Sequence, residues 1–226
     1  MTQAFDKLHL ADQTVGAIAA NLPGATAVFR RHKIDFCCAG DVALAEAAGK
    51  KGVDIATLEA ELAALTANDD DRMERADSDR LIAHLLTRYH AVHRTELPEL
   101  IALARKVEAV HSGHPEVPAG LANLLQRMAG ELEAHMKKEE LILFPAMQRH
   151  VAGLDTPITQ MRHDHLDHGD LLRLLEEMTD GFTLPAGACR SWQALYASAA
   201  KLSDDLQQHI HLENNVLFPR FEIQAG

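Results

Sequence analysis

The chain contains the same stretch twice. Residues 135–145 read HMKKEELILFP and residues 209–219 read HIHLENNVLFP, so a histidine, a glutamate four positions later and a Phe-Pro pair recur in one frame. On an α-helix, positions four residues apart lie on the same face. Each copy therefore places an imidazole and a carboxylate on one side of a helix, which is how helical bundles hold metal ions in their interior.

The spacing of apolar residues around both copies predicts that they face a core. In one segment, positions three or four residues apart are Leu121, Leu125, Met128, Leu132, His135, Glu139 and Ile142. The other segment repeats these intervals with Leu195, Ala199, Leu202, Leu206, His209, Glu213 and Val216. Such seams are typical of core-facing positions in helix bundles. Neither seam contains Arg or Lys, so a metal centre best compensates the two buried carboxylates.

Four long helices are predicted from residue 77 onward, at about 77–111, 119–152, 156–180 and 186–222. No alternation typical of strands appears, and the short loops favour antiparallel neighbours. We therefore expect an all-α fold in which residues 77–226 form an up-down-up-down four-helix bundle. Residues 1–65 contain shorter helical patterns that predict a small helical domain, and the polar segment TANDDDRMERA at 66–76 is typical of a linker.

The first and third long helices should supply further imidazoles at the level of the two motifs. His90 and His93 both fit the seam of the first helix, and His165 and His168 both fit that of the third. Spacing does not choose within either pair, since one histidine can be a ligand and the other its hydrogen-bond partner. Imidazole and carboxylate without thiolate suit Fe, Zn, Mn or Cu. Two glutamates from different helices can each bridge two ions, which favours a dinuclear centre with open coordination positions.

The charge of the chain argues against several kinds of partner. The sequence has 33 acidic and 22 basic residues and a formal net charge of -11, which disfavours nucleic acid or an anionic membrane. No run reaches the roughly 18 apolar residues of a membrane span, and the N-terminus lacks the pattern of a secretory leader. Three cysteines, of which Cys37 and Cys38 are adjacent, suit a reducing compartment. We expect a cytoplasmic protein.

Taken together, these residues resemble a known family. The two HxxxExxxxFP motifs on a four-helix bundle look like the hemerythrin-like fold. With the segment FRRHKIDFCCAG at 29–40, the chain is similar over about residues 10–222 to the repair-of-iron-centres family, of the ScdA/YtfE/DnrN type. The resemblance implies a cysteine-bearing N-terminal domain before a hemerythrin-like di-iron domain, in a cytoplasmic protein tied to nitrosative and oxidative stress. The chain departs from the family in Ala39, where a glycine is usual, and in the extra histidine His168.

The resemblance also implies a set of ligands. RYHAVHR and MRHDHLDHG resemble ligand segments of the family, and the two HxxxExxxxFP motifs supply the rest. The implied site holds two non-haem iron ions joined by an oxo or hydroxo bridge, and its bridging carboxylates are Glu139 and Glu213. The full implied set is His90, His135, Glu139, His165, His209 and Glu213.

Two functions follow from this interpretation. In the first, the protein repairs iron–sulfur clusters damaged by nitrosative or oxidative stress by donating iron to the damaged proteins. The thiols of Cys37 and Cys38 then hand over iron or sulfur, or relay electrons. In the alternative, it binds or reduces nitric oxide, with nitric oxide or dioxygen as a small ligand at the open positions. A structural bundle or a zinc-loaded interaction protein is the third hypothesis. A homodimer would stabilise the small N-terminal domain, which buries little surface by itself.

Overall fold

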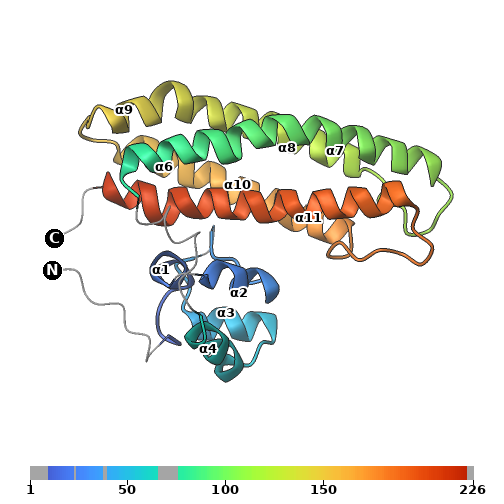
Figure 1. Ribbon diagram of the computed structural model, residues 1–226, viewed down its shortest axis with the longest axis horizontal. Coiled ribbons are helices and arrows are strands. Elements are labelled where there is room, and N and C mark those ends of the chain that lie inside the picture. Colours follow the sequence, from blue (N-terminus) through green and yellow to red (C-terminus); the bar gives the residue numbers. More distant parts are fainter. Residues whose placement is uncertain (1–9, 23, 38–39, 66–75, 223–226) are drawn as a thin grey trace. The chain divides into compact units, whose positions relative to one another are not determined.

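The structure is a computed structural model that describes residues 10–22, 24–37, 40–65 and 76–222 (Figure 1). Helices dominate these ranges, and the strand-like pairing within them is an isolated bridge between Thr14 and Ala43. The all-α fold class is therefore confirmed. The chain divides into two compact units, of which one is Ala83–Leu206 and the other combines Met1–Ile82 with Gln207–Gly226.

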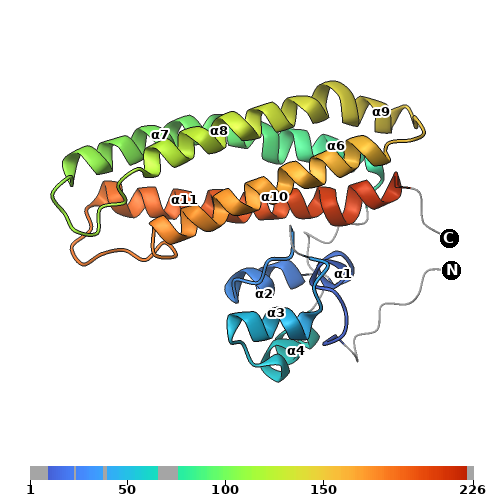
Figure 2. The ribbon, with the colours of Figure 1, turned by 180° about the vertical axis from the view of Figure 1, so that it is seen from behind.

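The larger unit is a bundle of long helices. Its elements are η1 (Leu85–His90), α7 (Ala91–Val110), α8 (Leu121–Lys138), η2 (Glu139–Leu143), α9 (Phe144–Gln148), α10 (Asp155–Met178) and the part of α11 (Arg190–His211) up to Leu206. Helix α8 packs against both α7 and α10. Figures 1 and 2 show α7, α8 and α10 as long neighbouring rods joined end to end by short loops. This is the four-helix architecture that the seams predict.

The seam residues of the bundle form its core. Leu121, Leu125, Met128 and Leu132 are buried on α8, as are Leu195, Ala199, Leu202 and Leu206 on α11. Gly120 precedes α8 with a φ of 91°, which a glycine adopts without steric cost, so the chain turns directly into the helix. The apolar core thus extends along the bundle up to the level of the two repeated motifs.

Three π-helical segments interrupt the long helices: η1, η2 and η3 (Leu212–Leu217). A π turn adds one residue to the helix and so rotates everything after it by roughly 100°. The prediction that Ile142 continues the buried seam of α8 is wrong for this reason. Ile142 is 65% exposed, whereas its neighbour Leu143 is buried.

The smaller unit contains four short helices and the end of the chain. Its N-terminal helices are α1 (Val15–Asn21), α2 (Ala25–Arg31), α3 (Leu44–Lys51) and α4 (Ile55–Ala63), followed by the start of α6 (Ser78–His84). Thr14 caps α1 and Asp54 caps α4, each by accepting a hydrogen bond from a backbone N–H three residues later. From the C-terminal end, η3 packs against α1, and η4 (Phe218–Arg220) follows it. Of the predicted linker at 66–76, all but Ala76 lies outside the described residues.

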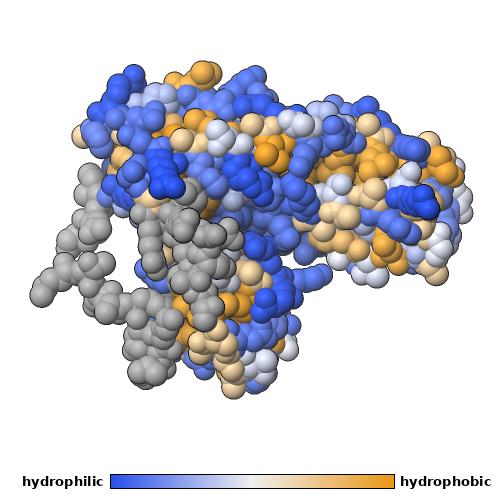
Figure 3. Space-filling model, in the orientation of Figure 1, coloured by the Kyte–Doolittle hydropathy of each residue, from blue (hydrophilic) through white to orange (hydrophobic). Residues whose placement is uncertain are grey.

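One face of the molecule is seen in the space-filling view. In Figure 3 hydrophilic residues cover much of the visible face, with apolar residues scattered between them. Each helix within the described ranges is too short or too polar to traverse a lipid bilayer.

One partly buried ion pair joins η1 to α11 within the larger unit. Arg88 donates two hydrogen bonds to the Asp205 carboxylate, at 3.0 and 2.6 Å, and Lys201 donates a third at 2.8 Å. Burial on its own raises the pKa of Asp205, but the Arg88 and Lys201 hydrogen bonds outweigh it and lower the pKa below its ordinary value. The ionised carboxylate therefore stabilises the folded state.

We predict that Asp205→Asn lowers the free energy of unfolding of the metal-free protein by about 1–2 kcal/mol at pH 7, because solvent at Arg88 screens part of the interaction. The folded-state pKa lies below the unfolded value of about 3.9. The loss should thus be complete above that pH and should fade as the pH drops through the folded-state pKa. Urea denaturation across this pH range measures it. Asp170→Asn, which removes an exposed pair with Arg173, is the control and should change little. If Asp205→Asn still lowered the free energy of unfolding at low pH, the ionised Asp205 carboxylate would not be the cause of the loss.

Candidate metal centre

The six residues of the predicted ligand set are all buried, each at most 2% exposed. Three of them lie in π-helical segments: His90 ends η1, Glu139 begins η2 and Glu213 lies in η3. π-Bulges are frequent at functional sites.

In the larger unit, Glu139 lies between two imidazoles. Its Oε2 is 3.5 Å from His90 Nε2, and its Oε1 is 3.3 Å from His135 Nε2. The Nε2 atoms of His135 and His165 are 3.0 Å apart. In the described part of the chain, neither carboxylate oxygen of Glu139 accepts a hydrogen bond, although both are fully buried. A buried carboxylate in this state is costly without a compensating cation.

A carboxylate outside the ligand set fixes the ring of His90. His90 Nδ1 lies 2.7 Å from Glu140 Oε1, and Arg94 donates two hydrogen bonds to the same carboxylate. Burial raises the pKa of Glu140, but the hydrogen bonds of Arg94 and His90 more than offset it and lower that pKa. An ionised carboxylate only accepts, so His90 carries its proton on Nδ1 and presents a lone pair at Nε2.

His135 has an equivalent partner in Asp164. His135 Nδ1 lies 3.3 Å from Asp164 Oδ2, which also accepts a 2.7 Å hydrogen bond from Lys138. The hydrogen bond to His135, together with those from Lys138 and Gln160, holds the pKa of Asp164 well below its ordinary value. The lone pair of His135 is thereby directed to Nε2, the atom that approaches Glu139 and His165.

The second copy of the motif lies in the smaller unit. His209 Nε2 is 3.0 Å from Glu213 Oε1, so the histidine and the glutamate four residues later do meet on one helix face. Both residues are buried, at the junction of α11 and η3. The spacing of the repeated motif is therefore realised as paired side chains in both copies.

The ligand atoms assemble into two groups that share both glutamates. One group is His90, Glu139, His209 and Glu213, and the other is His135, Glu139, His165 and Glu213. In each group, one nitrogen or oxygen atom per residue lies within 4.8 Å of the others. Neutral imidazoles and carboxylates are ligands for Fe, Zn, Mn or Cu. The residues present therefore fit metal ions, and the unbonded Glu139 carboxylate is explained by one.

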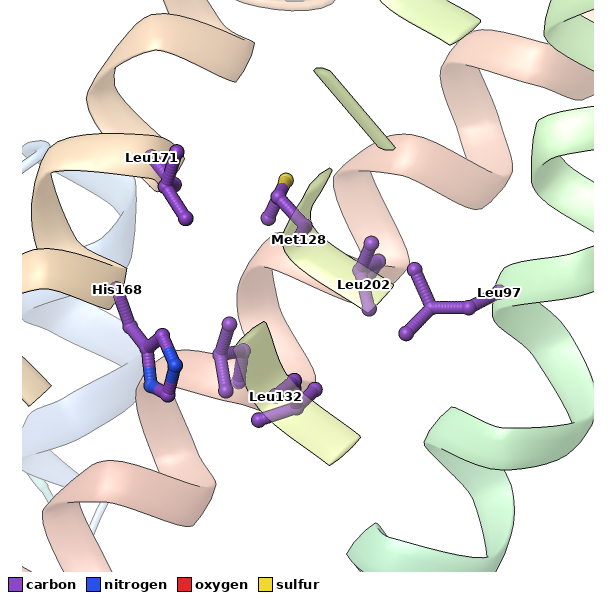
Figure 4. A pocket seen from close by; sticks show the side chains of 7 residues that line it. Leu97, Met128, Leu132, His168, Leu171 and Leu202 are labelled. Carbon is purple, nitrogen blue, oxygen red and sulfur yellow. The ribbon is translucent and has the colours of Figure 1, made fainter. Parts of the chain in front are cut away.

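Two of the candidate histidines lie outside both groups. His93 and His168 are buried on the seams, but neither belongs to a group among the described residues. The ring of His168 lies against that of His135, with centroids 5.0 Å apart. Figure 4 shows His168 beside a small pocket lined by apolar side chains that include Leu132 and Leu171. The two groups that could hold a metal thus contain His90 and His165 rather than His93 and His168, and their role as ligands stays a prediction.

Helical spacing along the sequence does not predict that Glu140 or Arg94 belongs to the site. A glutamate directly after Glu139 is expected about 100° around the helix from it, yet both carboxylates approach His90 at the start of η2. The signal available in the sequence was the Glu-Glu pair itself, with an arginine four residues after His90.

The two cysteines predicted to act as a relay are described only in part. Cys37 is buried, with its backbone N–H donating to Asp35 Oδ1 at 3.2 Å and its Sγ 3.5 Å from the same oxygen. Cys38 lies outside the described residues. The role of both thiols stays a prediction.

The helical bundle and its buried His/Glu groups define a class of protein. Residues 81–221 match the family model described as the hemerythrin HHE cation binding domain, and residues 11–66 match ScdA_N, a domain of unknown function (DUF542). The chain is 44% identical to the iron–sulfur cluster repair protein YtfE of Edwardsiella ictaluri, over 92% of this chain and 96% of that protein. The YtfE proteins of Musicola paradisiaca and Escherichia coli O157:H7 are 45% and 44% identical, over 94% and 92% of this chain and 97% and 96% of theirs. The chain belongs to the YtfE family of iron–sulfur cluster repair proteins.

We predict that Glu140→Ala weakens metal binding about 10- to 100-fold, because His90 loses the hydrogen bond that orients its ring. Glu131→Ala is the matched control, since Glu131 lies on α8 and pairs with exposed Arg127 instead of a ligand. Competition with a chromophoric chelator measures both affinities. Equal affinity of the two variants would show that Glu140 has no part in holding His90.

Proposed function

We propose that this protein repairs iron–sulfur clusters damaged under nitrosative or oxidative stress, and that it does so by donating iron. The proposal extends to this chain what the name of its YtfE relatives says of them. The observation that carries it is the pair of His/Glu groups that share Glu139 and Glu213. We infer two iron ions, each held by two histidines and both glutamates, with His90 and His209 on one ion and His135 and His165 on the other.

The small number of protein donors per ion suits a site that releases its iron to another protein. Two imidazoles and two shared carboxylates supply four protein donors per ion, fewer than the six that octahedral iron accepts. Iron held by these residues would therefore keep open coordination positions at which exchange could occur. The protein contributes the orientation of the ligands, through Glu140 and Asp164, and an apolar core that limits access of water.

Within this proposal the chain works as two parts. Residues 77–226 hold the iron, and residues 1–65 bring Cys37 and Cys38, which pass iron or electrons to a damaged protein. Reduced thiols require a reducing compartment, so we place the protein in the cytoplasm. A homodimer is compatible with this arrangement.

The open coordination positions also favour a second function, the binding or reduction of nitric oxide. The four histidines and two glutamates would hold a ferrous pair with vacant positions, which would supply binding sites for nitric oxide or dioxygen. The thiols discriminate between the two functions. Gas binding needs only the iron, whereas donation also needs Cys37 and Cys38 to pass the iron to a damaged protein.

We predict about two irons per chain in protein purified with iron, and loss of both in Glu139→Ala and Glu213→Ala, since each carboxylate is shared between the two groups. Without metal, both variants should unfold at the same or higher urea concentration than the parent, because the substitution removes a buried charge. Metal analysis with Mössbauer spectra, and urea denaturation of metal-free protein, test this. One zinc per chain, or iron retained in both variants, would refute the di-iron assignment.

We further predict that the iron-loaded protein restores a nitrosylated cluster enzyme faster than an equal amount of free ferrous iron. Replacing Cys37 and Cys38 together with Ala should abolish this advantage and leave nitric oxide uptake by the ferrous protein intact. The recovered activity of the cluster enzyme and the ferrous-nitrosyl spectrum are the two measurements. If free iron performs equally well, iron donation is wrong and nitric oxide chemistry becomes the better assignment.

A further inference from the structure

The loop that carries Cys37 is fastened to the segment that carries Glu213. Asn214 Nδ2 donates a 2.8 Å hydrogen bond to the carbonyl of Cys37, and Asn215 Nδ2 donates one of 3.1 Å to the carbonyl of Phe36. Both asparagines follow Glu213 directly in η3. Two consecutive peptide carbonyls of the cysteine loop are therefore bonded to the two residues that follow a candidate metal ligand.

The packing around these bonds is close. Phe36 is buried with its ring edge-on to His211, at a centroid distance of 5.6 Å, and Asn215 Nδ2 also lies 2.9 Å from His211 Nδ1. Cys37 itself is 5% exposed. The thiol of Cys37 is thus shielded while the loop stays against η3.

Two glycines bring the loop this near. Gly16 N donates to the carbonyl of Gly40 at 2.7 Å, and a Cβ atom on Gly40 would lie 2.8 Å from the carbonyl oxygen of Phe36. A Cβ on Gly16 would lie 3.0 Å from the side-chain oxygen of Asn215. A side chain at either glycine would crowd its neighbours, so glycine at these two positions permits the close approach that the asparagine hydrogen bonds hold.

We propose that Asn214 and Asn215 are positioning residues that hold Cys37 closed against η3, and that they link exposure of this thiol to metal binding at Glu213. Glu213 and the two amides belong to one turn of backbone, so a metal that orders this turn also holds the loop. The linkage is reciprocal, because whatever opens the loop weakens metal binding at Glu213 by the same factor. The linkage rests on the proposed metal site, whereas the closing of the thiol by the two amides does not.

The first test measures how fast Cys37 is alkylated in the metal-free full chain. With Cys38→Ser and Cys189→Ser as background, Cys37 is the single thiol, and iodoacetamide adds to it only when the loop opens. Asn214→Leu and Asn215→Leu keep the side-chain size but remove the donor. Each should raise the alkylation rate about tenfold, as expected when a buried carbonyl loses its donor.

Asn21→Leu is the matched control, since Asn21 donates an exposed hydrogen bond to the carbonyl of Ala17 within α1 rather than to the loop. It should leave the rate unchanged. Circular dichroism confirms that each variant is folded, and Asn214→Ala and Asn215→Ala replace any leucine variant that is not. Alkylation rates of folded asparagine variants within about twofold of the parent would overturn the proposal.

The second test adds Zn²⁺ or anaerobic Fe²⁺ alone to the same single-thiol background. Alkylation of Cys37 should slow about fivefold or more on metal loading, and this slowing should shrink in Asn214→Leu and Asn215→Leu. A metal-independent rate in protein shown to bind metal would overturn the linkage. Failure of the proposed function appears elsewhere, as absent iron or absent cluster repair, and does not change the thiol rates of metal-free protein.

Discussion

The rest of the structure depends on the burial of Glu139 and Glu213. Each carboxylate lies on a helix seam whose other positions are apolar, and neither seam offers an arginine or lysine. A bundle core tolerates such charges only when a cation or a set of donors compensates them. The histidines that accompany the two glutamates come from four helical segments, in two groups that could hold metal ions.

The π-helical segments explain how regular helices meet this requirement. A regular helix presents one residue per turn to a given point, whereas a site with two shared carboxylates needs ligands and their hydrogen-bond partners from neighbouring positions. At the start of η2, Glu139 and Glu140 approach opposite nitrogens of His90. The bulge exposes Ile142 as a consequence, so a loss of apolar burial accompanies the gain of an oriented ligand.

The π-helical segments mark the limit of what apolar spacing in the sequence predicts. Periodicity was sufficient for the all-α class, the four long helices and the burial of both repeated motifs, since each depends on apolar spacing alone. It did not distinguish His90 from His93, because residues three apart share a face and only the three-dimensional packing separates them. Glu140, Asn214 and Asn215 were not anticipated. Their roles depend on single hydrogen bonds within bulged turns, and hydrophobic patterns contain no information about those.

The two copies of the repeated motif differ in what lies next to them. In the copy at His135, the neighbouring polar groups are Asp164 and Lys138, which fix the imidazole ring. In the copy at His209, the residues after Glu213 are two asparagines bonded to the cysteine loop. The first copy thus has polar partners for its imidazole, and the second is bonded to the backbone of the loop that carries Cys37. The proposed donation of iron requires the site to respond to the thiols that pass the iron on, and these hydrogen bonds favour the half that contains Glu213 for that part.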